Sequence, residues 1–312
     1  MQQIRKWLRR GDAAPTVTLP TALDRPFRAI FFDWDGTAVV DRKEDASAFA
    51  RVAEGLLRQG VWLAVVTGTN FGNINRQLGQ VVAPGLRHHL LICTNRGSEV
   101  YGFDSTGEAV RRYLRVATSN ENQKLDAVTA AVARELHETY GLPVEVIADR
   151  LNRRKVDLIP VAEWADPPKA RIGELLQAVE GRLNAANVPG GLHGVIQLGE
   201  RVAQAQGLDA RVTSDVKNLE IGLTDKADAV AWLDRELLQP AGIPWHDVLI
   251  GGDEFGDIAG FPGSDSRLCA ASADAPVVSV GVEPNGVPPG VVALGGGPAR
   301  FRSLFARQVA LH

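Results

Sequence analysis

The sequence contains only two cysteines, Cys93 and Cys269, among its 312 residues. Two cysteines cannot form the disulfide framework on which small secreted domains depend, so we expect both to be reduced and to pack as small apolar side chains. The chain also lacks an apolar run of the ~20 residues that a membrane-spanning helix needs. The basic segment at residues 4–10 has no apolar stretch of signal-peptide length beside it. These absences predict a cytoplasmic protein without a membrane span.

A basic excess is missing too, because 34 lysines and arginines stand against 37 aspartates and glutamates, for a formal net charge of −3. Nucleic-acid-binding proteins usually carry a basic excess, so we expect no nucleic-acid partner. Small anionic substrates remain compatible with this charge, since a site can be locally positive in an acidic protein. The apolar content of 45% is typical of soluble globular proteins, so hydrophobic burial can stabilise the fold.

Short apolar runs alternate with longer helical periods, which indicates an α/β fold with a Rossmann-like parallel sheet. Phe49, Val52 and Leu56 lie on one face of a helix expected over residues 48–59, which Gly60 ends. Continuous apolar strands are typical of parallel sheets that are covered on both faces. The predicted strands are residues 29–32, 61–66, 89–93, 248–250 and 277–282.

A stretch of different character interrupts this pattern. It contains a helix over residues 120–140 and a hairpin whose polar turn spans residues 150–155. Two further helices and two short strands are expected at residues 169–186, 195–206, 210–213 and 219–221. We therefore predict four segments: an N-terminal leader at 1–23, an inserted α+β cap domain at 113–215, and a catalytic core formed by 24–112 and 216–312.

Polar residues follow directly on three of the apolar strands. Asp33, Thr67 and Asp253 each stand at the carboxyl end of a strand, where open α/β sheets bind ligands. Asp35 lies two positions after Asp33, and alternate strand residues point the same way, so both carboxylates are expected to face one site. Gly36 allows a tight turn that lets the backbone approach a ligand closely. The sequence therefore predicts a site at this edge of the sheet.

These residues resemble the four motifs of the haloacid dehalogenase superfamily of phosphatases, in the same order along the chain. The resemblance covers about residues 27–300. The matching residues are Asp33, Asp35, Gly36 and Thr37 in the first motif, Thr67 and Gly68 in the second, Lys226 in the third, and Asp253 and Asp257 in the fourth. The resemblance implies a Mg²⁺-dependent phosphatase that acts on a small phosphorylated substrate.

By this resemblance, Asp33 attacks phosphorus and becomes phosphorylated, while Asp35 protonates the leaving oxygen and later deprotonates the attacking water. Mg²⁺ would be held by the Asp33 carboxylate, the Asp35 backbone carbonyl and Asp253, with Asp257 contributing through a water or indirectly. The residues that would bind the phosphoryl group are Thr67, Gly68 and Lys226. A cation at such a site offsets the repulsion between a carboxylate nucleophile and a phosphate dianion.

The inserted domain lies between the second and third motifs, as in the type-II capped branch of the superfamily, subfamily IIB. That branch contains sugar-phosphate phosphatases, so the resemblance implies a sugar phosphate as substrate. Asn70, Asn95, Arg153 and Arg154 are the candidate substrate contacts. The two arginines could reach from the cap towards an anionic group. Alternatively, they form the solvated tip of a hairpin.

Two positions depart from the usual motifs. Gly256 stands where the fourth motif often has asparagine, which removes a supporting hydrogen bond. Asn70 stands near the place of an arginine that often follows the second motif, so that position carries no charge towards phosphate. Two other functions are compatible with the same fold and motifs. One is a sugar phosphomutase, which retains the phosphoryl group, and the other is a non-catalytic module that binds a phosphate or a sugar.

Overall fold

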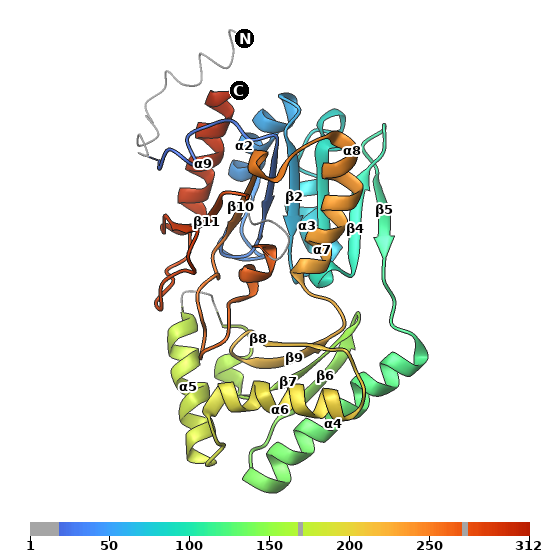
Figure 1. Cartoon of the computed structure of the whole chain (residues 1–312), viewed down its shortest axis with the longest axis vertical. Helices are drawn as coiled ribbons and strands as arrows, with labels where there is room; N and C mark the ends of the chain where they lie inside the picture. Colours follow the sequence, from blue (N-terminus) through green and yellow to red (C-terminus); the bar gives the residue numbers. More distant parts are fainter. Residues whose placement is uncertain (1–18, 168–170, 270–273) are drawn as a thin grey trace.

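The computed structural model describes residues 19–167, 171–269 and 274–312. Most of the leader expected at residues 1–23 therefore lies outside the described residues. In the described part of the chain, one eight-stranded sheet has the order β12-β11-β10-β1-β2-β3-β4-β5 and a separate four-stranded sheet has the order β6-β7-β9-β8. Figure 1 shows the larger sheet in the upper half of the molecule and the smaller one below it.

The larger sheet is parallel from β12 to β3, whereas β4 and β5 at its edge run antiparallel. Its strands are β1 (Ala29–Phe32), β2 (Trp62–Val66), β3 (Leu90–Thr94), β4 (Glu99–Phe103), β5 (Ala109–Leu114), β10 (Val248–Gly252), β11 (Val277–Ser279) and β12 (Val291–Ala293). The five strands expected in the core are confirmed, and their bounds differ from the expected ones by no more than three residues. The carboxyl ends of β1, β2 and β10 lie at one edge because these strands are parallel neighbours.

Helices cover both faces of this sheet. Ile30 and Phe32 point towards α2 (Ser47–Arg58) and α9 (Gly297–Leu311), together with α3 (Phe71–Ile74). Ala29 and Phe31 point the other way, towards α7 (Lys226–Leu233) and the π segment Asp234–Leu238, which leads into α8 (Gln239–Ala241). Because successive strand residues face opposite sides, an unbroken apolar strand serves two cores at once. The predicted α/β core is therefore confirmed.

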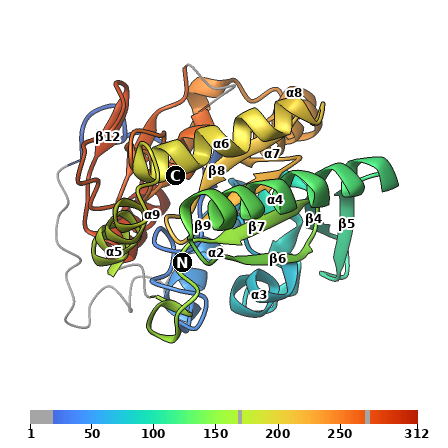
Figure 2. The same cartoon turned by 90° about the horizontal axis from the view of Figure 1, so that it is seen from below.

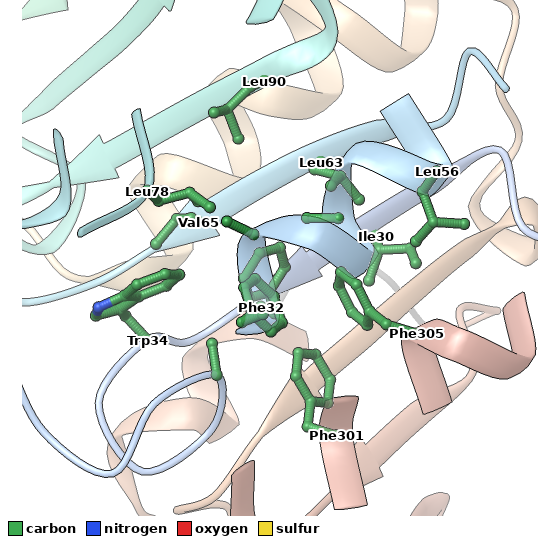
Figure 3. Close-up of a cluster of buried hydrophobic side chains, with 14 of the residues drawn as sticks. Ile30, Phe32, Trp34, Leu56, Leu63, Val65, Leu78, Leu90, Phe301 and Phe305 are labelled. Carbon is green, nitrogen blue, oxygen red and sulfur yellow. The ribbon is translucent and has the colours of Figure 1, made fainter. Parts of the chain in front are cut away.

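An aromatic cluster fixes α2 and α9 on the sheet. The ring of Phe32 lies 5.6 Å from that of Phe49, 5.5 Å from Phe301 and 5.4 Å from Phe305. Figure 3 shows Phe301 and Phe305 reaching from α9 towards Phe32. Aromatic pairs at such separations contribute about 0.5–1.5 kcal/mol each beyond the burial of their surface. The phenylalanine that directly precedes Asp33 is thus held by several packed rings.

The smaller sheet is antiparallel throughout. Its strands are β6 (Glu145–Arg150), β7 (Arg153–Asp157), β8 (Arg211–Ser214) and β9 (Asn218–Gly222). Three helices, α4 (Ser119–Tyr140), α5 (Ile172–Ala185) and α6 (Gly191–Ala205), pack on one face. Figure 1 shows α4 and α6 on the far side of the sheet from the core and α5 beside one end of it, so the other face of the sheet is turned towards the core, and Figure 2 shows the same helices from below. We refer to this insert as the cap.

Shorter helical segments connect these elements. The 3₁₀ segments are Pro84–His89, Asn95–Gly97, Ala162–Trp164, Trp245–Asp247 and Ser264–Cys269, and the π segments are Asn75–Gly79 and Asp234–Leu238. A search of the described residues for a helix with the length and apolarity of a membrane span found none.

The cap differs from the expectation in two places. β9 pairs with β7 and β8, so the insertion extends past residue 215 to at least Gly222. The expected polar turn at residues 150–155 is shorter, because Arg153, Arg154 and Lys155 belong to β7. Charged residues usually favour a turn over a central strand. Here β7 is flanked on both sides by β6 and β9, and the buried Glu220 contacts two of its charged residues, Arg153 and Lys155.

Candidate active site

A cavity of about 240 Å³ lies between the carboxyl ends of the core strands and the open face of the cap sheet. Its lining residues are Asp33, Asp35, Arg42, Thr67, Gly68, Thr69, Asn70, Asn95, Arg96, Arg150, Arg153, Lys155, Asp215, Glu220, Lys226, Glu254 and Ser264. The cavity thus brings together most of the residues that the sequence analysis selected. It also includes charged residues that the sequence analysis did not select.

Asp33 stands at the bottom of this cavity. Its backbone N–H donates to the carbonyl of Gly251 at 3.0 Å, which continues the pairing of β1 with β10 by one residue. The Nζ atom of Lys226 lies 2.7 Å from Asp33 Oδ1, and both side chains are buried. Lys226 is the first residue of α7, which Asp225 caps through the backbone N–H of Ala227. The helix start therefore places the ammonium against the end of β1.

The charge of Lys226 is stabilised by two carboxylates. Burial by itself lowers the pKa of the ammonium, but Asp265 and Asp33 outweigh this effect and hold the pKa above its ordinary value. Lys226 therefore remains charged at neutral pH. A buried cation beside Asp33 offsets the charge of that carboxylate against an incoming anion.

Asp265 is a site residue that the sequence analysis missed. One oxygen of its buried carboxylate contacts the Lys226 ammonium. The other accepts hydrogen bonds from the backbone N–H groups of Asp253, at 2.8 Å, and Glu254, at 2.9 Å. Oxygen atoms of Asp33, Asp253 and Asp265 lie within 4.8 Å of one another, and this is the acidic group found in a search of the described residues for metal sites.

Asp257, which the fourth motif led us to expect as a contributor through a water or indirectly, is not part of this acidic group. Its side chain is exposed, because the chain leaves the site at Gly256 and forms a loop before it returns. The return is held by Gly263 N–H, which donates to the Gly256 carbonyl at 3.1 Å, and by Asp265 N–H, which donates to the Glu254 carbonyl at 2.9 Å. The second acid therefore arrives twelve residues after Asp253. A spacing of this length gives no periodic signal in a sequence.

The acidic group fits a small divalent cation such as Mg²⁺. Mg²⁺ prefers carboxylate oxygens and usually retains several waters. Asp253 packs so closely on the first motif that a Cβ atom at Gly36 would lie 2.3 Å from Asp253 Oδ2, and Gly36 has φ of +91°. Thr37 Oγ1 donates to Asp253 Oδ1 at 2.9 Å. Both oxygens of Asp265 accept hydrogen bonds, one from the Lys226 ammonium and the other from the backbone N–H groups of Asp253 and Glu254, so Asp265 orients the acidic group.

The second-motif residues form one wall of the cavity. Thr67 is buried at the end of β2, and its backbone N–H donates to the Cys93 carbonyl at 3.0 Å. Asn70 caps α3 by accepting from the Asn73 backbone N–H at 3.1 Å. Asn95 donates to the Glu99 carboxylate. Asn70 and Asn95 thus line the cavity while their side chains also hold the loops that form it.

Arg153 and Arg154 face opposite sides of β7. Arg153 lines the cavity, as does Lys155 two residues later. Arg154 points to α4, where it contacts Asp126 at 2.6 Å and Asn122 at 3.1 Å, so the expectation of a substrate contact from Arg154 is not met by this geometry. The reason is the twofold alternation of a strand, which a hairpin tip would not impose.

Glu220 of β9 was also not selected from the sequence. It lies between Leu219 and Ile221 in β9, and its buried carboxylate contacts Arg96 at 2.7 Å, Arg153 at 3.3 Å and Lys155 at 2.6 Å. Burial raises the pKa of this carboxyl, but the cations outweigh burial and hold the pKa well below its ordinary value. The only available signal was an acidic residue within a buried strand, which generally requires a cationic partner.

Comparison with known proteins supports the fold. No protein-family model matches the chain, and no curated protein matches it. Among solved structures, IMP-bound, N-terminally truncated IMP-nucleotidase from Plasmodium falciparum aligns with a TM-score of 0.58 and 12% identity over 92% of this chain and 69% of that chain. Trehalose-6-phosphate phosphatase from Aspergillus fumigatus aligns with a TM-score of 0.52 and 13% identity over 93% of this chain and 95% of that chain. The chain therefore has a haloacid dehalogenase-like fold.

Proposed function

We propose that this protein is a Mg²⁺-dependent phosphohydrolase that cleaves a phosphate monoester through an aspartyl-phosphate intermediate on Asp33. The observation that carries the proposal is the buried Asp33 carboxylate, 2.7 Å from Lys226 Nζ and beside Asp253, in a cavity that Asp35 also lines. A nucleophile, an acid/base and a cation site are the three components that the very slow hydrolysis of a phosphate monoester requires.

In the proposed reaction, an oxygen of Asp33 forms a bond to phosphorus while the bond from phosphorus to the leaving oxygen breaks. Asp35 gives its proton to that oxygen, so the alcohol departs neutral. Asp35 then takes a proton from a water whose oxygen attacks phosphorus, and inorganic phosphate leaves as the Asp33 carboxylate is regenerated. Lys226 balances the negative charge near Asp33 in both steps. A Mg²⁺ ion held by Asp33 and Asp253 supplies further charge stabilisation to the phosphoryl oxygens.

We further propose a phosphorylated sugar as the substrate. The cavity is lined by charged and polar side chains from both the core and the cap, including Arg150, Asp215 and Ser264. Such a lining offers donors and acceptors to a hydroxyl-rich molecule and offers little apolar surface to a hydrophobic one. The cap covers the cavity, so its residues are suited to selecting the leaving group and excluding water.

The test is phosphate release from a panel of sugar phosphates, nucleotides and small phosphorylated acids, with Mg²⁺ and with a chelator. We expect Mg²⁺-dependent release that is concentrated on a few sugar phosphates and absent from the Asp33→Asn variant. Conversion of a sugar phosphate to its isomer, dependent on a bisphosphate activator and without phosphate release, would instead identify a phosphomutase. Binding without turnover of any panel member would identify a binding module.

A further inference from the structure

The cap side of the cavity contains a group of cations around one acid, which we call the Glu220 cluster: Arg96, Arg153, Lys155 and Glu220. Arg96 comes from the core loop after β3, whereas the other members lie on β7 and β9 of the cap. All four line the cavity. The cluster therefore joins the core to the cap at the place where a substrate would lie between them.

The cluster has more hydrogen-bond donors than acceptors. Each guanidinium has five N–H donors and an ammonium has three, whereas a carboxylate has two oxygens. Among the described residues, the buried Nε atoms of Arg96 and Arg153 have no hydrogen-bond partner. Arg153 is only 7% exposed although it lines the cavity. Buried donors are almost always paired in folded proteins, so these two indicate a partner that binds.

The cluster also has more positive than negative charge. Lys155 contacts Asp215 at 2.8 Å in addition to Glu220, so the ion pairs of the cluster join three cations to two carboxylates. Glu254 and Asp225 also raise the pKa of Arg96 through their charge, after Glu220 and Asp215. Burial and the neighbouring Arg96 lower the pKa of the Arg153 guanidinium by more than Glu220 and Asp215 raise it, so the pKa lies below its ordinary value. The positive charge of Arg153 is thus incompletely compensated, and a further anion would complete the compensation.

The Glu220 cluster and Lys226 have different carboxylate partners, which are Glu220 and Asp215 for the cluster and Asp33 and Asp265 for Lys226. Arg153 donates to the carbonyl of Gly68 at 3.3 Å, and a Cβ atom at Gly68 would lie 3.6 Å from Arg96 Nε. The two guanidinium groups therefore lie over the second-motif loop. Charge at Asp33 is already offset by Lys226, on the core side of the cavity. The cationic surplus of the cap is consequently available to another part of the substrate.

We propose that the Glu220 cluster binds a second anionic group, a carboxylate or a second phosphate, on the part of the substrate that the reaction releases. This inference rests on the proposed phosphohydrolase function and specifies its substrate class. Guanidinium groups bind both anions through paired N–H donors, so the shared chemistry is an oxyanion. A sugar phosphate without a second anionic group would leave the surplus donors unpaired, which lowers transition-state binding for that substrate.

The test compares glucose 6-phosphate with 6-phosphogluconate, which adds a carboxylate, and with glucose 1,6-bisphosphate, which adds a phosphate. We expect kcat/KM for at least one of the two esters with a second anionic group to exceed that for glucose 6-phosphate by about ten-fold or more, which is the effect of a charge-assisted hydrogen bond. In Arg153→Gln that ratio should fall towards one, and Arg153→Lys should restore part of it. Arg154→Gln is the matched control, because Arg154 is equally buried on the same strand but faces α4.

The outcomes separate the two proposals. Absence of Mg²⁺-dependent release from these three esters and from every other member of the panel would overturn the proposed function together with this inference. Release with equal kcat/KM for glucose 6-phosphate and for the two esters that carry a second anionic group would overturn the inference alone. An equal loss for all esters in Arg153→Gln would also overturn it, because it would show that Arg153 acts on the transferring phosphoryl group or on the fold. If Arg153→Gln does not melt cooperatively, Arg96→Gln tests the same ratio.

Discussion

The Nζ atom of Lys226 lies 2.7 Å from Oδ1 of Asp33, although the two residues are 193 positions apart in the chain. The contact joins the first residue of α7 to the first residue after β1. Asp265 contacts the same ammonium from a third segment. One buried cation therefore couples the candidate nucleophile to the loop that carries Asp253. The following predictions test this arrangement and the packing that supports it.

Replacing Asp33 with asparagine should abolish turnover and leave the fold intact. The amide keeps the shape and can still accept a hydrogen bond from Lys226, but it is not a nucleophile. We expect phosphate release to fall by about 10³-fold or more. The measurement is phosphate release under Mg²⁺, with circular dichroism as the check on folding. Wild-type rates in a preparation whose substitution is verified by mass spectrometry would refute the assignment.

Replacing Lys226 with methionine should destabilise the protein. The methionine leaves Asp33 and Asp265 as buried carboxylates without their shared cation. Removing one partner of a buried ion pair costs about 3–5 kcal/mol in the free energy of unfolding. Urea unfolding measures the change. Lys43→Met is the matched control, because the Lys43–Asp166 pair is exposed, and we expect little change from it. Equal unfolding midpoints for the two variants would contradict the prediction.

Replacing Asp265 with asparagine should weaken the response to Mg²⁺, whereas replacing Asp257 should not. The asparagine has no negative charge to pair with Lys226, and its side chain has one acceptor oxygen where the carboxylate has two. Substitutions of residues that orient metal ligands typically cost about 10–100-fold in metal affinity or activity. Titration of activity against Mg²⁺ concentration measures this effect. Asp257→Asn provides the comparison, because its side chain is exposed and outside the acidic group. A larger loss in the Asp257→Asn variant would instead favour Asp257 as the second acid of the fourth motif.

Glu220 should make the stability of the protein fall as the pH is lowered. The cations hold the pKa of this carboxyl below its ordinary value of 4.5 in the folded state. The stabilisation it provides is therefore fully present above the unfolded-state pKa and is lost as pH falls towards the folded-state pKa. We expect wild type to lose stability more steeply than Glu220→Gln between about pH 6 and about pH 3 in urea unfolding. Glu138→Gln, at an exposed site on α4, is the control, and its free energy of unfolding should fall with pH as steeply as that of wild type.

Replacing Phe305 with alanine should loosen α9 from the sheet. Phe305 is fully buried, and its ring lies 4.9 Å from Phe49 as well as 5.4 Å from Phe32. Truncating a buried phenylalanine to alanine typically costs about 3–5 kcal/mol in the free energy of unfolding. Urea unfolding again measures the loss. Val282→Ala, at a site that is 95% exposed, should change the midpoint very little.

Local patterns were sufficient for much of the core. The strand that ends at Phe32 and the helix over residues 48–59 depend on runs of apolar residues, and both appear within one residue of the expected bounds. The C-terminal helix α9 was not predicted. Phe301, Leu304, Phe305 and Gln308 have helical spacing and are buried, but three consecutive glycines directly before this segment favoured a loop. Gly296 in fact forms the cap of this helix with φ of +81°.

The residues of the candidate site also divide into those that local sequence patterns reveal and those that they do not. Asp33, Thr67 and Asp253 could be selected because each directly follows an apolar strand, and parallel strands end at one edge. Asp265 and Glu220 could not be selected, because their roles depend on a loop that returns and on cations brought from other strands. Arg154 was selected wrongly as a cavity residue because the hairpin turn proved shorter than its polar sequence suggested.

The sequence by itself determined the α/β class, the alternation of strands and helices and the edge at which the candidate nucleophile stands. These follow from the period of apolar residues, which acts within a few positions of the chain. Only the tertiary structure decided which acid completes the group around Lys226 and which cations surround Glu220. Those choices depend on contacts between segments up to 193 residues apart, and a buried charge accepts whichever partner the packing brings within reach.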